Sequence, residues 1–84
     1  MSQVVRISGQ RDGEGLLIKL GEAVRAARTA RGLSQEALAD AAGVDRSHMG
    51  KIERGERNVT ILNVARVASA LDALPSDLLR AAGL

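Results

Sequence analysis

The side chains of this sequence that could do chemistry are mostly cationic. Twelve residues are Lys or Arg and ten are Asp or Glu, which leaves a formal net charge of +2, and ten of the twelve cations are Arg. Arginine presents a planar fork of donors that suits phosphate groups and guanine edges. A genome rich in G and C would raise the Arg content as well, so the spacing of these residues has to decide between the two interpretations.

The residue types that are missing exclude several classes of site. The sequence has no cysteine and one histidine, His48, which excludes disulfides, thiol catalysis and imidazole-rich metal sites. It has no Phe, Tyr or Trp, which argues against proteins that stack single-stranded bases on aromatic rings. Gly9, Gly13 and Gly15 do not form a phosphate-binding loop or a dinucleotide fingerprint. We therefore expect a protein that is not an enzyme and needs no cofactor and no metal.

Apolar spacing and capping residues predict an all-α chain of five short helices. Ala and Leu are abundant and there is one proline, a composition that favours helices. We expect helices over residues 16–31, 35–42 and 46–54, a fourth from residue 61 and a fifth from residue 75. Ser34, Asp45 and Thr60 stand where N-caps are needed. Gly32, Gly43 and Gly55 stand at the expected C-terminal ends.

Two finer expectations concern the ends of this arrangement. Residues 1–15 differ from the rest and form an N-terminal extension, which is either flexible or contains a short strand at Val4, Val5 and Ile7, so that the helical domain covers residues 16–84. The inward face of the fourth helix is expected to hold Ile61, Val64, Ala68 and Leu71, with Val67 beside them.

Residues 35–54 have the spacing of a helix-turn-helix, because two helices of about eight residues flank a turn at Gly43. The second helix of this motif enters the major groove of duplex DNA by its N-terminal end. The candidates for base contacts share its solvent face: Arg46, Ser47 and Lys51. The residues expected to point inward are Met49, Ile52 and Glu53. The alternative is that the polar residues form a solvated helix face with no ligand.

Gly50 is unusual because it falls inside this second helix, where glycine costs about 1 kcal/mol relative to alanine. One interpretation is that DNA or a neighbouring subunit approaches closely there. The other is neutral variation at an exposed position.

The stretch LSQEALADAAGVDRSHMGKIERGERNVTI, residues 33–61, resembles the Cro and phage-repressor type of helix-turn-helix regulators. The resemblance extends over about residues 20–79. It is carried by Gln35 at the start of the first helix of the motif, by Ala39 inside it, by Gly43 and Val44 at the turn and by the run Ile52-Glu53-Arg54-Gly55. Asp45-Arg46-Ser47 and Arg57-Asn58-Val59-Thr60 look most like restriction–modification controller proteins. The resemblance implies a compact five-helix, lambda-repressor-like DNA-binding domain.

The same resemblance assigns roles to individual side chains. It implies that Gln35 holds a DNA phosphate and braces the reading helix, and that Arg28 and Glu53 form a partly buried ion pair between the first and third helices. The remaining phosphate contacts that we expect are His48, Arg57, Asn58 and Thr60. Thr60 has a competing role, since capping the fourth helix would explain it equally well.

One reading helix contacts too few base pairs to find a site in a genome, so we expect a homodimer on a palindromic operator. The candidate dimer contacts are apolar or small residues near the C-terminus: Leu62, Ala65, Ser69, Leu74, Leu79 and Leu84. The alternative places all four leucines in the monomer core.

Two functions are compatible with these expectations. The first is a sequence-specific transcriptional regulator of double-stranded DNA that controls its own gene, like a controller protein, with RNA polymerase as a candidate partner. The second is an antitoxin that binds a toxin protein and represses their shared promoter. No apolar run approaches the ~18 residues of a membrane helix and no signal peptide opens the chain, so we expect a cytoplasmic protein with no membrane partner.

Overall fold

The computed structural model describes residues 15–84, which form five α-helices. Their bounds are α1 Leu16–Ala30, α2 Gln35–Ala42, α3 Arg46–Glu53, α4 Ile61–Ala70 and α5 Pro75–Ala81. The expected all-α architecture is therefore confirmed, with element ends within about one residue of the predicted ones. The proposed N-terminal extension, with its alternative short strand, lies outside the described residues except for Gly15. Within the described part, no helix combines the length and the apolar content that crossing a bilayer requires.

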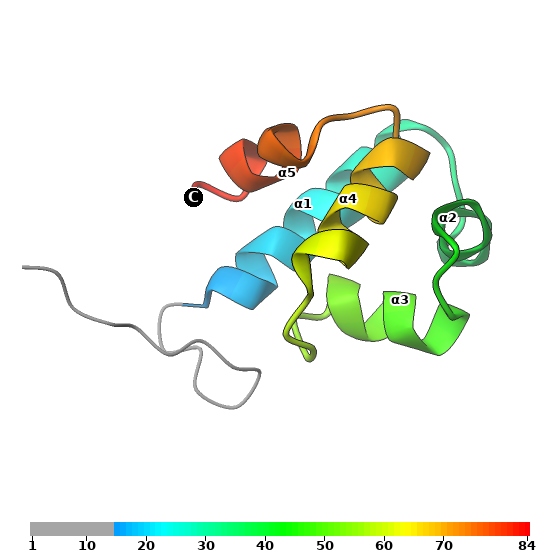
Figure 1. Ribbon diagram of the computed structural model, residues 1–84, viewed down its shortest axis with the longest axis horizontal. Helices are drawn as coiled ribbons and strands as arrows, with labels where there is room; N and C mark the ends of the chain where they lie inside the picture. The colour runs from blue at the N-terminus through cyan, green and yellow to red at the C-terminus, as the bar shows by residue number, and fades with distance from the viewer. Residues whose placement is uncertain (1–14) are drawn as a thin grey trace, which may run out of the picture.

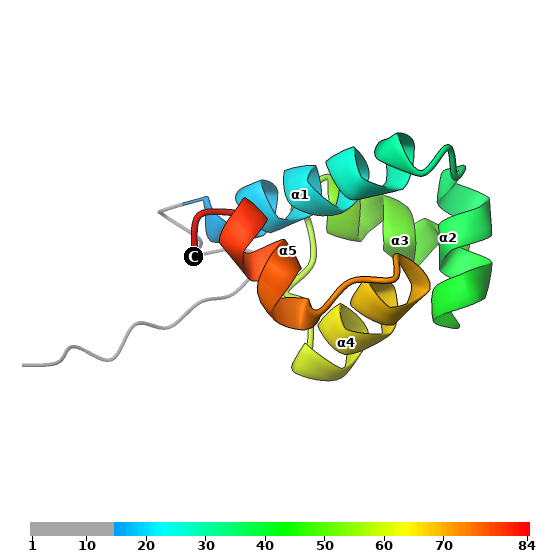
Figure 2. The same cartoon turned by 90° about the horizontal axis from the view of Figure 1, so that it is seen from above.

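The long helix α1 runs along the molecule, with α2 at one end and α5 at the other (Figures 1 and 2). α1 packs against α3 and α5, while α4 packs against α2 and α5. The α2–α3 pair also packs together. This arrangement leaves one side of α3 uncovered by any other helix of the described residues (Figure 1).

The three predicted caps set the starts of α2, α3 and α4. The hydroxyl of Ser34 accepts a hydrogen bond from the Ala37 N–H at 3.0 Å, and the hydroxyl of Thr60 accepts one from the Asn63 N–H at 3.1 Å. Asp45 caps α3 in the same way. Because the first amides of a helix have no intrahelical partner, these caps satisfy donors that would otherwise depend on water.

The core lies between the helices and is built from aliphatic side chains. Its most completely buried large residues are Leu38, Met49, Ile52 and Val67. The inward face predicted for α4 is correct at Val64, Ala68 and Leu71 and wrong at Ile61, which is 72% exposed. Ile61 is the first residue of α4, and the buried side of this helix begins one turn later, at Val64. The helical spacing of apolar residues therefore includes the first turn of α4, although that turn does not contact the core.

α1 and the C-terminal end of α3 approach each other closely at Gly21, a residue that was not predicted from the sequence to have a role. A Cβ on Gly21 would lie 2.5 Å from the carbonyl oxygen of Glu53 and still closer to that of Ile52. Real Cβ atoms do not approach backbone oxygens so closely, and the oxygens belong to a helix end that cannot move independently. Gly21 therefore sets the distance between α1 and the C-terminal end of α3.

We expect Gly21→Ala to destabilise the domain, because the methyl group forces α1 and α3 apart. Overpacking typically costs about 1–3 kcal/mol, which corresponds to a melting temperature lower by roughly 5–20 °C in a domain of this size. Thermal unfolding followed by circular dichroism measures this change. The matched control is Gly50→Ala, where the same methyl would meet only flexible side chains. Equal melting temperatures for Gly21→Ala and the wild type would contradict the close approach.

Candidate nucleic-acid interface

The turn between α2 and α3 holds the two helices in the arrangement expected of a helix-turn-helix. Gly43 ends α2 with a left-handed backbone at φ 69° and ψ 32°, a conformation that residues with a Cβ adopt only at a cost. Val44 follows and packs against the core. Val44 therefore fills the space between α2 and α3. The next residue, Asp45, is the N-cap of α3.

α3 has one buried and one exposed face. Met49 and Ile52 are 0% and 2% exposed and anchor the inner face as expected. Arg46 and Ser47 are exposed on the opposite side, and Lys51 is half-buried beside them. Arg46 makes only a loose contact with the Glu36 carboxylate, at 3.6 Å between two well-exposed side chains. Such pairs contribute little to stability, which leaves the Arg46 guanidinium available to a ligand.

Ser47 differs from the other two candidates because its hydroxyl is already engaged. It donates to the Asp45 carboxylate, which also accepts from the backbone N–H groups of Ser47 and His48 at 3.1 and 3.4 Å. The hydrogen bond from the Ser47 side chain, followed by that from the His48 backbone, lowers the pKa of Asp45 below its usual value. Ser47 therefore keeps its acceptor lone pairs for a base but has no free proton to donate.

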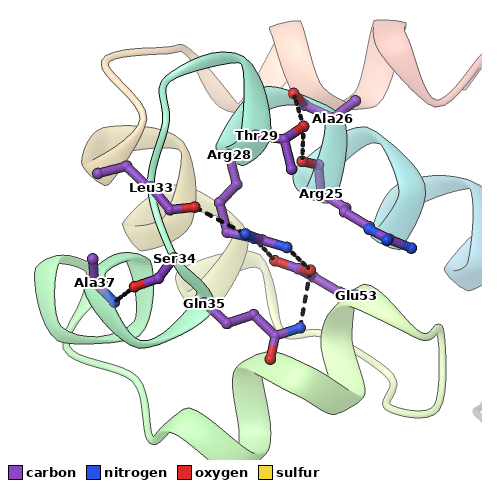
Figure 3. Close-up of polar contacts among 9 residues, drawn as sticks. All are labelled: Arg25, Ala26, Arg28, Thr29, Leu33, Ser34, Gln35, Ala37 and Glu53. Carbon is purple, nitrogen blue, oxygen red and sulfur yellow. Dashed lines mark hydrogen bonds and ion pairs between the residues drawn. The ribbon is translucent and has the colours of Figure 1, made fainter.

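The inner end of α3 is held by a charged cluster (Figure 3). Arg28 donates from Nε and Nη2 to the two carboxylate oxygens of Glu53, at 2.7 and 3.1 Å, and from Nη1 to the Leu33 carbonyl at 2.8 Å. Gln35 donates from Nε2 to Glu53 Oε1 at 3.0 Å. The side chains of Arg28 and Glu53 are 13% and 2% exposed. Arg28 of α1 thus binds both the loop between α1 and α2, at Leu33, and the C-terminal end of α3, at Glu53.

Gln35 is the first residue of α2, where the resemblance implies that it both braces the reading helix and holds a DNA phosphate. Because a carboxylate only accepts hydrogen bonds, the contact with Glu53 fixes which end of the Gln35 amide faces it. Nε2 carries a second N–H that this contact does not use. The bracing contact is thus present in the structure, and the phosphate contact remains a proposal.

Gly50 is buried, so its interpretation as an exposed neutral position is wrong. The atoms nearest to the place of a Cβ are Nη1 of Arg54 at 3.0 Å and Oε1 of Gln35 at 3.5 Å. Side chains of the same molecule therefore occupy the space that this glycine leaves open.

The residues expected to contact phosphates beyond α3 lie around the start of α4. Arg57 and Asn58 are exposed in the loop. Thr60 fulfils its competing role as a cap. The His48 ring is half-buried, with Nε2 3.5 Å from Nδ2 of Asn63.

A hollow beside His48 contains residues that sequence reasoning missed. It has a volume of about 280 Å³ and is lined by Gly43, Val44, Asp45, His48, Asn63 and Arg66. Arg66 is exposed there and forms no ion pair within residues 15–84. The residues predicted on α4 were its inward apolar ones and the candidate dimer contacts Leu62, Ala65 and Ser69, which include neither Asn63 nor Arg66. The spacing of Asn63 and Arg66 could have indicated this hollow, because side chains three residues apart share one face of a helix.

The candidate dimer contacts divide into two groups. Leu62, Leu74 and Leu84 are 63%, 64% and 54% exposed, which contradicts the alternative that all four leucines lie in the monomer core. Leu79 does pack partly against the core. Ala65 is half-buried and Ser69 is exposed. An apolar surface on α4 and around α5 is thus available to a partner.

Comparison with known proteins adds independent information. Residues 24–79 match the family model described as helix-turn-helix. The control protein C.SmaI of Serratia marcescens is 43% identical over 65 residues, which span 77% of this chain and 77% of that protein. The crystal structure of the restriction–modification controller protein C.AhdI from Aeromonas hydrophila is 52% identical over 74% of this chain and 94% of its own, with a TM-score of 0.73. The clp gene regulator ClgR from C. glutamicum has a TM-score of 0.77 and 34% identity over 81% of this chain and 88% of its own.

We expect Glu53→Ala to lower both stability and DNA affinity, because it leaves the Arg28 guanidinium without its carboxylate and releases the end of α3. Losing one partner of a buried pair costs roughly 3–5 kcal/mol, or a melting temperature lower by about 12–40 °C in a domain of this size. The matched control is Glu56→Ala, which removes an exposed pair with Arg54 worth at most about 1 kcal/mol. A loss of affinity at an unchanged melting temperature would show that Glu53 does not hold α3.

Proposed function

Since the chain belongs to the helix-turn-helix family of DNA-binding transcriptional regulators and resembles restriction–modification controllers within it, we propose that it binds a palindromic operator as a homodimer and controls its own gene. One observation carries the proposal: α3 is fixed on its inner face and presents Arg46 and Lys51 on its outer one. A rigid helix with free donors suits the major groove, where each base pair shows its own pattern of donors and acceptors.

The proposed contacts divide into base readers and phosphate contacts. Arg46 and Lys51 donate to base edges, and Ser47 accepts there. The contacts to the DNA backbone come from Gln35 at the start of α2, from His48 within α3, and from the residues between α3 and α4, which are Arg57, Asn58 and Thr60. Phosphate contacts fix register and orientation, whereas contacts to base edges carry the sequence information.

A homodimer is supported by the exposed leucines of α4 and the α5 region. Two copies place two α3 helices about one turn of DNA apart, which doubles the readout. The proposed contacts are Leu62, Ala65, Ser69, Leu74, Leu79 and Leu84. A direct contact with RNA polymerase would suit an activating role.

The antitoxin alternative predicts a different partner. A toxin protein would co-purify with the chain, and its gene would lie next door, whereas a controller would neighbour a nuclease and a methylase. The likeness to control proteins of restriction–modification systems favours the controller.

The direct test is selection of bound sites from random duplex DNA. We expect a symmetric site whose two halves lie about one helical turn apart, because the two α3 helices of a dimer face successive major grooves. No enrichment over bulk competitor DNA at moderate salt would overturn the proposed function.

We expect Arg46→Ala and Lys51→Ala to relax preference at particular base pairs, since a bidentate side chain supplies roughly 1–3 kcal/mol of discrimination. Arg57→Ala should instead weaken all duplexes alike and reduce the slope of log K against log salt by about 0.9. Binding titrations on cognate and scrambled duplexes at several salt concentrations separate the two effects. Lys19→Ala is the control, because Lys19 lines a groove formed by α1 and the α5 region, to which neither α2 nor α3 contributes a residue. Uniform loss from all three substitutions would contradict the division between readers and phosphate contacts.

We expect Leu62→Glu and Leu74→Glu to raise the dimer dissociation constant by at least about tenfold, because each places a charge inside an apolar interface. Both leucines are mostly exposed, so the helical content of the monomer should stay the same. Sedimentation equilibrium measures the change, with Ala41→Glu on the exposed side of α2 as control. Unchanged self-association in both leucine variants would place the interface elsewhere.

A further inference from the structure

A groove between α1 and the α5 region has no part in the proposed function. Its volume is about 640 Å³. Its apolar lining includes the buried side chains of Ala23 and Leu78 and the exposed ones of Ala26 and Ala81. In Figure 1, α5 lies on the side of α1 opposite to α3. A duplex held by α3 therefore leaves this groove open to another occupant.

The charges beside the groove indicate what kind of segment it suits. They are those of Lys19, Glu22 and Asp77. Glu22 is exposed and forms no ion pair within residues 15–84. The Asp77 carboxylate accepts a hydrogen bond from the Leu74 N–H at 2.8 Å, but it has no cationic partner in the same residues. One cation and two anions leave a local excess of negative charge, so an apolar segment with one positive charge fits best.

The chain contains such a segment before α1. Residues 4–7 read Val-Val-Arg-Ile, and they include the residues for which the sequence predicts a short strand as one alternative. Successive side chains of an extended segment point to opposite sides. Val5 and Ile7 thus share one face, and Val4 and Arg6 share the other.

The lengths of the segment and of the groove agree. Four extended residues are about 13 Å long, and the part of α1 that lines the groove, from Lys19 to Ala27, is about 12 Å long at 1.5 Å per residue. Residues 8–14 connect the segment to Gly15 and span up to about 24 Å. Ala27 lies about 18 Å from Gly15 along the helix axis, so the connection can reach every part of the groove within one molecule.

We propose that residues 4–7 bind in extended form in the groove of their own chain, with Val5 and Ile7 on its apolar floor. The long side chain of Arg6 reaches from the outer face to the carboxylates of Glu22 and Asp77 at the rim. Because α5 has seven residues and little stability of its own, the bound segment holds α5 against α1.

The proposal also fixes the direction of the segment. The chain returns from Gly15 along α1, so residue 2 comes to the end of the groove at Ala27 and Ala73. These two residues belong to the same end because Arg31 and Asp72 form an ion pair there, at 2.9 Å.

The first measurement locates the segment by paramagnetic relaxation in the full chain. The sequence has no cysteine, so Ser2→Cys carries a nitroxide label at one position only. We expect loss of the amide signals of Ala27 and Ala73 and retention of those of α3. Retained signals at both alanines, or loss centred on α3, would overturn the proposal.

A mixed sample distinguishes the chain's own segment from that of a second copy. Labelled protein without isotope enrichment is added to unlabelled, isotope-enriched protein. We expect no loss at Ala27 and Ala73 in this sample. Loss there as strong as in the labelled chain itself would mean that the groove takes the segment of another molecule, and it would overturn the proposal.

The second measurement compares two substitutions of the same kind on opposite faces of the segment. Val5→Asp should lower the melting temperature by about 4–8 °C, because it places a charge on the apolar floor. It should also restore the signals of Ala27 and Ala73 in the labelled chain. Val4→Asp is the matched control and should change neither quantity. Equal effects of the two substitutions, or no effect of either, would contradict binding by one face.

The third measurement tests the charge at the rim. Arg6→Glu should restore the two alanine signals in the labelled chain, because it brings a third carboxylate to Glu22 and Asp77. Arg11→Glu makes the same change of charge outside the bound segment and should leave the signals lost. Equal behaviour of the two variants would overturn the proposal. All three measurements are made without DNA, so their outcome is independent of whether the chain selects an operator.

Discussion

The junction between α1 and the C-terminal end of α3 is the constraint on which the rest of the structure depends. Gly21 lets the backbone of α1 lie directly against the carbonyl oxygens of Ile52 and Glu53, and Arg28 then reaches across to the Glu53 carboxylate. The first contact sets the distance between the helices and the second sets the rotation of α3 about its own axis. A helix of eight residues has little stability of its own, so its direction has to come from such contacts.

Holding α3 by a charged cluster has a cost, because burying a carboxylate removes its hydration. The structure offsets that cost by giving Glu53 three hydrogen bonds from two side chains. None of the buried side-chain nitrogen or oxygen atoms of residues 15–84 lacks a hydrogen-bond partner. The geometric demands of this cluster are strict, since a guanidinium and a carboxylate meet through both oxygens in one relative orientation. An apolar contact would hold α3 nearby without specifying which face it turns outward.

The helix boundaries could be predicted from the sequence because they depend on neighbouring residues. Ser34 and Thr60 satisfy amides three residues away, and a cap of this kind is visible in any short stretch of sequence. The error at Ile61 and the omission of Gly21 have another origin. Whether the first turn of α4 reaches the core, or whether a glycine faces another backbone, depends on how helices distant in sequence pack. The Arg28–Glu53 pair joins residues that are also distant, and only the family resemblance indicated it.

The distribution of charge matters more here than its total, because a formal net charge of +2 is small. Glu53 is the only acidic residue within α3, and a free carboxylate there would repel the phosphates of a duplex. Its burial and its pairing with Arg28 remove that charge from the outer surface while using it to hold the helix. Asp45 is engaged by its cap contacts. Of the two acids that α3 needs for its position and its start, Glu53 has its charge compensated by the Arg28 guanidinium, whereas Asp45 stays exposed and is bonded to neutral donors. Arg46 and Lys51 supply the positive charge of the outer face of α3.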